Sequence, residues 1–310
     1  MSILVCGSMA YDTIMVFQDP FRKHILPDQI HILNVCFVVP TMRREFGGCA
    51  GNIAYNLRLL GEEPQIMATV GHDFGPYAHR LERLGLSCRH IRVLEEQFTA
   101  QAFITTDIED NQITAFHPGA MGGSHLNRIA DASGVRLGIV SPAGREGMIE
   151  HSRGFAAAGI PFILDPGQGM PMFSGEDLMG MLQGARALTV NDYEGRMFEQ
   201  KTGRTLREVA GLVEAVVMTR GPEGATVFTG GQQFDVPPVK PEGLVDPTGC
   251  GDAHRAGLLH GLVQGWGWAK AARLGSLMGS IKIAHRGGQN HSPSREEVAA
   301  RYEKAFGETL

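Results

Sequence analysis

The chain has 310 residues, 41 of them glycine, and a formal net charge of −5 at pH 7. Hydrophobic residues make up 43% of it, which is enough for the core of one large α/β domain. The acidic balance excludes the basic surface that nucleic-acid binding needs. No apolar run is long enough to span a membrane. The scattered cysteines argue for a reducing cytoplasm and against a disulfide framework or a structural zinc site.

The N-terminal residues predict a strand that ends in a polar turn. Residues 1–7 are a short apolar run without a basic leader, so we expect a first strand rather than a signal peptide. The chain continues as Gly7-Ser8-Met-Ala-Tyr-Asp12, which places Ser8 and Asp12 just after this strand. The Asp12 carboxylate can accept hydrogen bonds from two neighbouring hydroxyl groups, although a single aspartate in such a place is more often only a turn residue.

Two stretches, 13–46 and 98–117, are rich in Val, Ile, Phe and Thr and indicate a small β element apart from the main sheet, with a turn at 110–111. Such an element would form a lid, from about 13–46 and 98–120, over the carboxyl ends of the main strands, where ligands bind in doubly wound folds. Phe103 and Phe116 lie in this lid. They are either ordinary packing residues or aromatic rings that face a ligand.

The sequence Phe46-Gly47-Gly48-Cys49-Ala50-Gly51-Asn52 leads into a predicted helix over 50–60, with Gly61 as its expected end. Glycines such as Gly48 let the backbone approach a ligand closely, and Asn52 can both donate and accept hydrogen bonds. A glycine pair by itself is weak evidence. Followed by an asparagine at the start of an amphipathic helix, it indicates a binding site.

From about residue 130 the chain alternates between short apolar runs and helix-length segments. The apolar runs lie at 137–140, 160–164, 187–190 and 215–218. Buried strands separated by helices predict βαβ units and a parallel sheet. We therefore expect one domain over 1–310, an α/β fold with a doubly wound, mostly parallel sheet and the small β lid.

Polar turns follow three of these strands. Gln168 follows the strand at 160–164 and could hydrogen-bond a ligand or be a plain loop residue. Asn191 and Glu194 follow the next strand, where the asparagine can cap a helix and the carboxylate can hold a hydrated Mg²⁺. The turn after the last strand contains Thr219, Gly221 and Gly224.

The most informative segment is Asp246-Pro-Thr-Gly-Cys-Gly-Asp252-Ala-His-Arg-Ala-Gly257. A glycine-bearing turn leads into an apolar helix, and the free N–H groups at a helix N-terminus favour an anion. Asp252 stands at the start of that helix, where a carboxylate can take a proton from an attacking hydroxyl group. The alternative is that Asp252 is an ordinary helix cap and the glycines are only a turn.

In this order, the segments 7–12, 46–52, 191–194, 219–224 and 246–257 resemble the motifs of the ribokinase-like (PfkB-type) kinases, and the resemblance spans nearly the whole chain. It implies a phosphotransferase that uses ATP as co-substrate and an alcohol group as acceptor. Two positions depart from the usual pattern. Cys250 stands where Ala, Gly or Ser is common but keeps its backbone N–H, and His254 replaces a frequent Phe, which we interpret as a packing variant.

The resemblance also implies a role for each motif. Asp252 would be the general base, beside an anion hole formed by the N–H groups of Gly249, Cys250 and Gly251. The acceptor would be held by Ser8, Asp12, Gly48 and Asn52. ATP would be held by Asn191, Thr219, Gly221 and Gly224. Glu194 would position Mg²⁺ through water, and the loop 284–290 would flank the adenine and share a K⁺ ion with the segment 246–248.

The acceptor itself is indicated by the lid. The run Phe116-His-Pro-Gly-Ala is similar to bacterial adenosine and nucleoside kinases of this family, which implies that Phe103, Phe116 and Gln168 contact a base. We predict an ATP-dependent nucleoside kinase acting on the 5′-OH of adenosine and other nucleosides. A sugar kinase of the ribokinase or fructokinase type and a non-catalytic ligand sensor are the alternatives. The expected partners are small molecules, without nucleic acid or membrane, and the expected assembly is a monomer or a homodimer through the lid.

Overall fold

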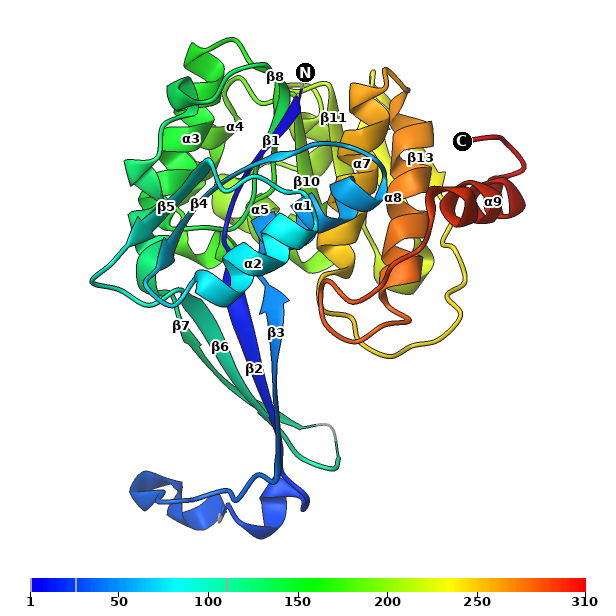
Figure 1. Ribbon diagram of the computed structural model, residues 1–310. Coiled ribbons are helices and arrows are strands. Elements are labelled where there is room, and N and C mark those ends of the chain that lie inside the picture. The colour runs from blue at the N-terminus through cyan, green and yellow to red at the C-terminus, as the bar shows by residue number, and fades with distance from the viewer. Residues whose placement is uncertain (1, 26, 110) are drawn as a thin grey trace.

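A large twisted sheet forms the frame of the protein, and the computed structural model describes it together with the rest of residues 2–25, 27–109 and 111–310 (Figure 1). Within these residues the sheet has nine strands, in the order β13-β12-β11-β10-β9-β8-β1-β4-β5. Strand β12 is antiparallel to both neighbours, and all other pairs are parallel. In chain order the strands are β1 (Ser2–Cys6), β4 (Gln65–Gly71), β5 (His90–Leu94), β8 (Val135–Val140), β9 (Phe162–Leu164), β10 (Ala187–Asn191), β11 (Ala215–Thr219), β12 (Ala225–Thr229) and β13 (Gln232–Val236).

Helices cover both faces of this sheet because its strands are apolar on both sides. Along β1, Ile3 belongs to one core and its neighbour Leu4 to the other, as the alternation of side chains in a strand requires. The first core packs under α1 (Cys49–Leu59), α2 (Gly75–Arg83), α7 (Cys250–Val263) and α8 (Trp268–Lys282). The second packs under α3 (Arg145–Ala157), α4 (Gly175–Leu182), α5 (Asp192–Thr202) and α6 (Leu206–Val209). The predicted doubly wound α/β fold is confirmed.

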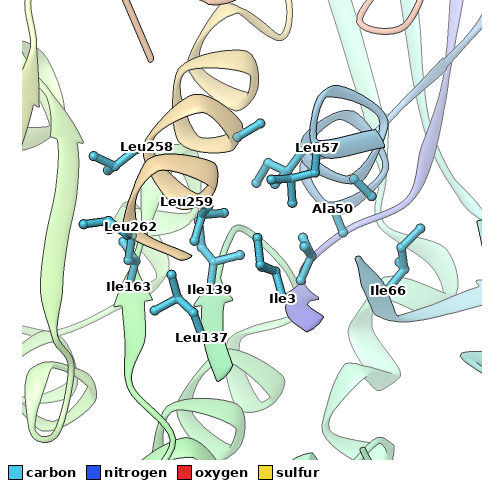
Figure 2. Close-up of a cluster of buried hydrophobic side chains, with 14 of the residues drawn as sticks. Ile3, Ala50, Leu57, Ile66, Leu137, Ile139, Ile163, Leu258, Leu259 and Leu262 are labelled. Carbon is cyan, nitrogen blue, oxygen red and sulfur yellow. The ribbon is translucent and has the colours of Figure 1, made fainter. Parts of the chain in front are cut away.

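Helices α1 and α7 lie side by side on the first face, and each begins at one of the two glycine-bearing segments that the sequence singled out. Figure 2 shows Leu259 of α7 above Ile139 of β8 and Leu262 above Ile163 of β9, with Leu57 of α1 on the same side of the sheet. Helix α9 (Arg295–Phe306) packs on the outside of α8. The predicted helix at 50–60 is confirmed as α1, and Gly61 follows it with a φ of 89°, a conformation that favours glycine.

A second, small sheet projects from the edge of the large sheet at which β1 ends (Figure 1). Its order within the described residues is β3-β2-β6-β7. The strands are β2 (Ala10–Val16), β3 (Thr41–Gly47), β6 (Ala100–Thr106) and β7 (Gln112–His117). Strands β2 and β6 are parallel, and the other two pairs are antiparallel. We call this sheet the lid. Of the turn predicted at 110–111, residue 110 lies outside the described residues.

One part of the predicted lid is wrong. The described residues between 17 and 40 form no strand and contain the short 3-10 helices η1 (Phe21–Lys23) and η2 (Pro27–Ile32). The rings of Phe17, Phe21 and Phe37 pack on one another there, with centroids 4.8 to 6.0 Å apart. Prolines lack the N–H that a strand ladder needs, and the apolar residues serve this local cluster instead of a sheet face.

The remaining short helices are η3 (Gly119–Leu126), η4 (Ile129–Asp131), η5 (Gly167–Met172) and η6 (Gly221–Glu223). The cysteines at 6, 36, 49, 88 and 250 are all free thiols. Over the residues that the structure describes, every helix is too short or too polar to cross a lipid bilayer.

Candidate active site

The polar turns that the sequence singled out gather at the carboxyl edge of the large sheet, because parallel strands all end on the same side. Asn191 and Thr219 are direct partners in the register of β10 and β11. Asp165 follows β9 one strand away, and Ser8 follows β1. The lid projects from this same edge (Figure 1). The structure therefore brings the predicted site residues of the large sheet to one place.

The N-terminus of α7 has the features of a candidate anion site. Gly249 precedes the helix with a φ of 77°, in the left-handed region, and Asp252 lies in the first turn. The N–H of Gly251 has no hydrogen-bond partner among the residues that the structure describes. The N–H of Cys250 differs from the prediction, since it donates to the carbonyl of Pro247 at 3.1 Å and so closes the turn. The free N–H groups and the helix dipole favour a negative group here.

Asp252 lies beside this anion site and contacts α1. Its Oδ2 accepts a hydrogen bond from Nδ2 of Asn52 at 2.8 Å. Burial raises the pKa of Asp252 to about 6, although the hydrogen bond from Asn52 and the charge of Arg255 lower it. A carboxylate with a pKa near neutrality can take up and release a proton readily.

The side chain of Asn52 is held by residues that sequence reasoning missed. Nε2 of Gln289 donates to Oδ1 of Asn52 at 3.1 Å and also contacts the hydroxyl of Tyr77 at 2.6 Å. The hydroxyl of Tyr77 donates to the carbonyl of Gly47 at 2.9 Å. These groups are buried. They fix the amide of Asn52 with its NH₂ group toward Asp252, a contact that the sequence motif did not indicate.

Asp12 lies on the lid strand β2, close to the glycine pair. A side chain at Gly47 would come within 2.5 Å of Oδ2 of Asp12, and one at Gly48 within 2.6 Å of the Ala10 backbone nitrogen. Gly48 also has a φ of 85°, so both glycines are needed for this close approach. Burial, and then the charges of Asp246 and Glu45, raise the pKa of Asp12 to about 6. Such a carboxylate gains from hydroxyl donors that replace its lost water.

Ser8 ties the end of β1 to the start of α1. Its Oγ accepts from the N–H of Cys49 at 3.1 Å, and its carbonyl accepts from the N–H of Ala50 at 2.9 Å. Ser8 is 8% exposed. These bonds fix the chain just after the glycine pair, and the small exposed area of Ser8 leaves little of its surface for a ligand.

A buried ion pair that the sequence did not reveal lies between α7 and the sheet edge. The guanidinium of Arg255 donates to both carboxylate oxygens of Asp165, at 3.0 Å each, and lies 3.9 Å from Oε2 of Glu194. Burial and then the charge of Asp165 raise the pKa of Glu194, while Arg255 opposes the shift. Two carboxylates thus share one guanidinium. Arg255 lies in the quoted segment 246–257, and Asp165 directly follows the predicted strand at 160–164, but no local pattern predicts that they meet.

The turns after β10 and β11 combine helix capping with tight backbone. Asn191 and Glu194 form a capping box, each side chain accepting from the other residue's N–H at 2.7 Å. The turn after β11 closes with a bond from the N–H of Arg220 to the carbonyl of Gly224 at 2.8 Å. A side chain at Gly224 would meet the carbonyl of Val236 at 2.1 Å, so this turn requires glycine.

The lid register separates the two aromatic residues that the sequence placed together. Asp12 pairs with Ala102, and Ala102 pairs with Phe116, so Phe116 shares the face of Asp12. Phe103 points to the opposite face because successive residues of a strand alternate. Phe116 is 51% exposed and Phe103 42%. The two rings therefore lie on opposite faces of the lid and cannot both stack on one base, so the predicted contact of Phe103 with a base stays a prediction. Gln168 lies exposed on η5, beyond the end of β9.

The chain is similar to known kinases over nearly its whole length. The family model for pfkB family carbohydrate kinases matches residues 33–295. The structure of the Burkholderia thailandensis nucleoside kinase in complex with inosine is 50% identical, with a TM-score of 0.90 and 99% of each chain covered. In complex with ADP-inosine the same kinase is 52% identical, with a TM-score of 0.88, over 99% of this chain and 97% of that one. A nucleoside kinase from Methanocaldococcus jannaschii is 28% identical over 87% of this chain and 90% of its own length.

Proposed function

This chain belongs to the pfkB family of carbohydrate kinases, and from that premise we propose that it is an ATP-dependent nucleoside kinase that phosphorylates the 5′-OH of adenosine, inosine and related nucleosides. The observation that carries the proposal is that the candidate general base, Asp252, lies beside the candidate anion site at the N-terminus of α7. Asp252, with its pKa raised to about 6, lies in the first turn of α7 beside the free N–H of Gly251. The likeness to the Burkholderia thailandensis kinase with inosine supports a nucleoside as the acceptor.

In the proposed reaction the 5′-oxygen attacks the γ-phosphorus of ATP while Asp252 takes the hydroxyl proton. The bond from the γ-phosphorus to the bridging oxygen breaks, and ADP leaves with that oxygen and its electron pair. The N–H groups of Gly249 and Gly251 and the dipole of α7 would stabilise the negative charge on the transferred group. Asn52, held by Gln289, would keep the Asp252 carboxylate turned toward the hydroxyl group.

The remaining turns would hold the two substrates. Asp12 would accept hydrogen bonds from the ribose hydroxyls, with the backbone at Gly48 close by. ATP would lie along the ends of β10 and β11, against Asn191, Thr219, Gly221 and Gly224. Their neighbouring positions at the carboxyl edge support this assignment.

Mg²⁺ fits the charge of the site. Asp165 and Glu194 place two carboxylates beside one guanidinium, which leaves a net negative charge near the ATP side. In the part of the chain that the structure describes, no group of three or more His, Cys, Asp or Glu side chains is arranged to hold an ion directly. We therefore propose that Glu194 orients a hydrated Mg²⁺, which keeps several waters in most sites and would neutralise charge on the β- and γ-phosphate oxygens.

The proposal also includes the cellular compartment and the oligomeric state. Free thiols at all five cysteines suit a reducing cytoplasm. Met42, Phe103 and Ile113 are exposed on the lid face that lies opposite Asp12, and this apolar surface favours a homodimer through the lid over a monomer.

A substrate panel tests the proposal. With ATP and Mg²⁺, we expect kcat/KM for the best of adenosine, inosine, guanosine and cytidine to exceed that for ribose and fructose by about tenfold or more, because a stacked base adds roughly 1–3 kcal/mol that a free sugar cannot supply. A higher kcat/KM for ribose or fructose than for every nucleoside would identify a sugar kinase. Binding of nucleoside and ATP without any turnover would identify a sensor.

Two lid variants locate the base. Phe116→Ala should lower kcat/KM for nucleosides by roughly 5- to 150-fold, the equivalent of about 1–3 kcal/mol of lost stacking. Phe103→Ala removes the same ring from the opposite face of the lid and should change kcat/KM less than twofold. Steady-state kinetics of both variants decide the point. Equal losses in the two variants would mean that the rings only stabilise the lid, and Phe116 would then not contact the base.

A further inference from the structure

Two loops meet behind the anion site and are tied together by the backbone. The N–H groups of Val245 and Asp246 donate to the carbonyl of Ile283, at 2.9 and 3.1 Å. The Asp246 carboxylate accepts from the N–H of Gly287 at 2.8 Å and from that of Thr248 at 2.9 Å. The loop 245–249 leads directly into α7, so this junction sets where the helix begins. This is also the place between 246–248 and 284–290 at which the family resemblance implies a monovalent cation.

That place already contains a positive charge from the chain itself. Lys282, the last residue of α8, is fully buried. Its Nζ donates to the carbonyl of Asp246 at 2.7 Å and to the carbonyl of His285 at 2.9 Å. One carbonyl comes from each loop, so the ammonium group bridges them. Its charge also lies near the Asp246 carboxylate and contributes to lowering the pKa of that group, after the backbone hydrogen bonds from Gly287 and Thr248.

The residues present do not fit an added K⁺ ion. K⁺ is bound by rings of carbonyl oxygens, and the oxygens of Asp246 and His285 are occupied by the ammonium group. A second positive charge at hydrogen-bond distance would repel the first, and inside the protein that repulsion is only weakly screened. A buried ammonium group is retained only where it is paired, and here the two carbonyls and a carboxylate supply the pairing.

We propose that Lys282 is a tethered internal cation that takes the place of a bound monovalent ion at this junction, so that the protein needs no K⁺. Lys282 acts through the loops and is a positioning residue. It holds the carbonyl of Asp246, and with it the turn of Pro247 to Gly249 that presents the N-terminus of α7. The activity arm of the test rests on the proposed nucleoside kinase function, whereas the stability arm does not.

The test compares the wild type with Lys282→Met in KCl, NaCl and choline chloride at equal ionic strength. For the wild type we expect the same thermal midpoint and the same kcat in all three salts. For Lys282→Met we expect a loss of kcat of about tenfold or more in choline chloride, partial recovery in KCl, and a thermal midpoint that is higher in KCl than in choline chloride. A cavity with two unpaired carbonyls should accept K⁺ once the ammonium group is gone.

Lys270→Met is the matched control. Lys270 lies on the same helix, but its Nζ donates to the Thr309 carbonyl at the exposed C-terminus, away from the junction. Its variant should show no difference between the salts.

Activation or stabilisation of the wild type by K⁺ over Na⁺ and choline would overturn the proposal, and so would a folded Lys282→Met variant that behaves alike in all three salts. Should that variant not fold, Lys282→Gln, which keeps a donor of similar reach, and the wild-type salt series decide the matter. A wild type that phosphorylates no nucleoside would refute the proposed function but leave the thermal midpoints as a test of Lys282.

Discussion

Replacing Asp252 by asparagine is expected to lower kcat by about 100-fold or more, the usual span for loss of a positioned general base. The amide has nearly the same shape and can still contact Asn52, so binding of ATP and nucleoside should persist. Steady-state kinetics with separate binding measurements test this expectation. Glu176→Gln, which removes an exposed acidic group from the first turn of α4, is the control and should leave kcat unchanged.

The pH dependence of kcat gives the same residue a second signature. Because the pKa of Asp252 is raised to about 6, the ionised base is present above that pH and is lost as the pH falls through it. We expect kcat at saturating nucleoside to decline about tenfold per pH unit well below 6, and the Asp252→Asn variant to lack this decline. Saturation matters because Asp12, which we propose binds the acceptor, has a pKa that is also raised to about 6. Near-normal turnover of the variant would mean that Asp252 is a helix cap and not the base.

Replacing Arg255 by methionine is expected to cost the protein about 3–5 kcal/mol of unfolding free energy, the typical effect of breaking a buried ion pair by removing one partner. The guanidinium is the shared partner of Asp165 and Glu194, and the side chains of the Arg255–Asp165 pair are only 6% and 5% exposed. Without it the buried carboxylate of Asp165 and the partly buried carboxylate of Glu194 lose the positive charge that they share. Urea unfolding of the variant and the wild type, monitored by circular dichroism, measures the difference.

The pH and a second substitution distinguish this mechanism from general damage. Burial and the charge of Asp165 already raise the pKa of Glu194, and loss of the opposing guanidinium would raise it further, so protonation of Glu194 at low pH should make the deficit smaller at pH 5 than at pH 8. Asp165→Asn added to Arg255→Met should recover part of the loss, as coupling between contacting residues requires. Arg128→Met breaks an exposed ion pair with Asp131 and should cost no more than about 1 kcal/mol. A loss of that size for Arg255→Met would show that the buried pair adds little.

The sequence by itself determined the fold class and the segments that form the candidate site. The apolar runs at 137–140, 160–164, 187–190 and 215–218 became β8, β9, β10 and β11, because a short run of apolar residues between helix-length segments is stable as a strand covered on both faces. The glycine turn before α7 was readable for a similar reason. A left-handed residue, a helix start and an acidic residue in the first turn depend only on neighbours in the chain.

Only the tertiary structure decided which residues meet across long stretches of chain. Arg255 pairs with Asp165, 90 residues away, and Gln289 contacts Asn52, 237 residues away. Whether Phe103 or Phe116 faces Asp12 followed from the register of β6 and β7, since a shift of one residue would exchange the two faces. Lys282 would pass for an ordinary basic residue at a helix end until the fold closes both loops around its ammonium group. Patterns along the chain report local conformation, whereas charge pairing and strand register are set by the packing of distant elements.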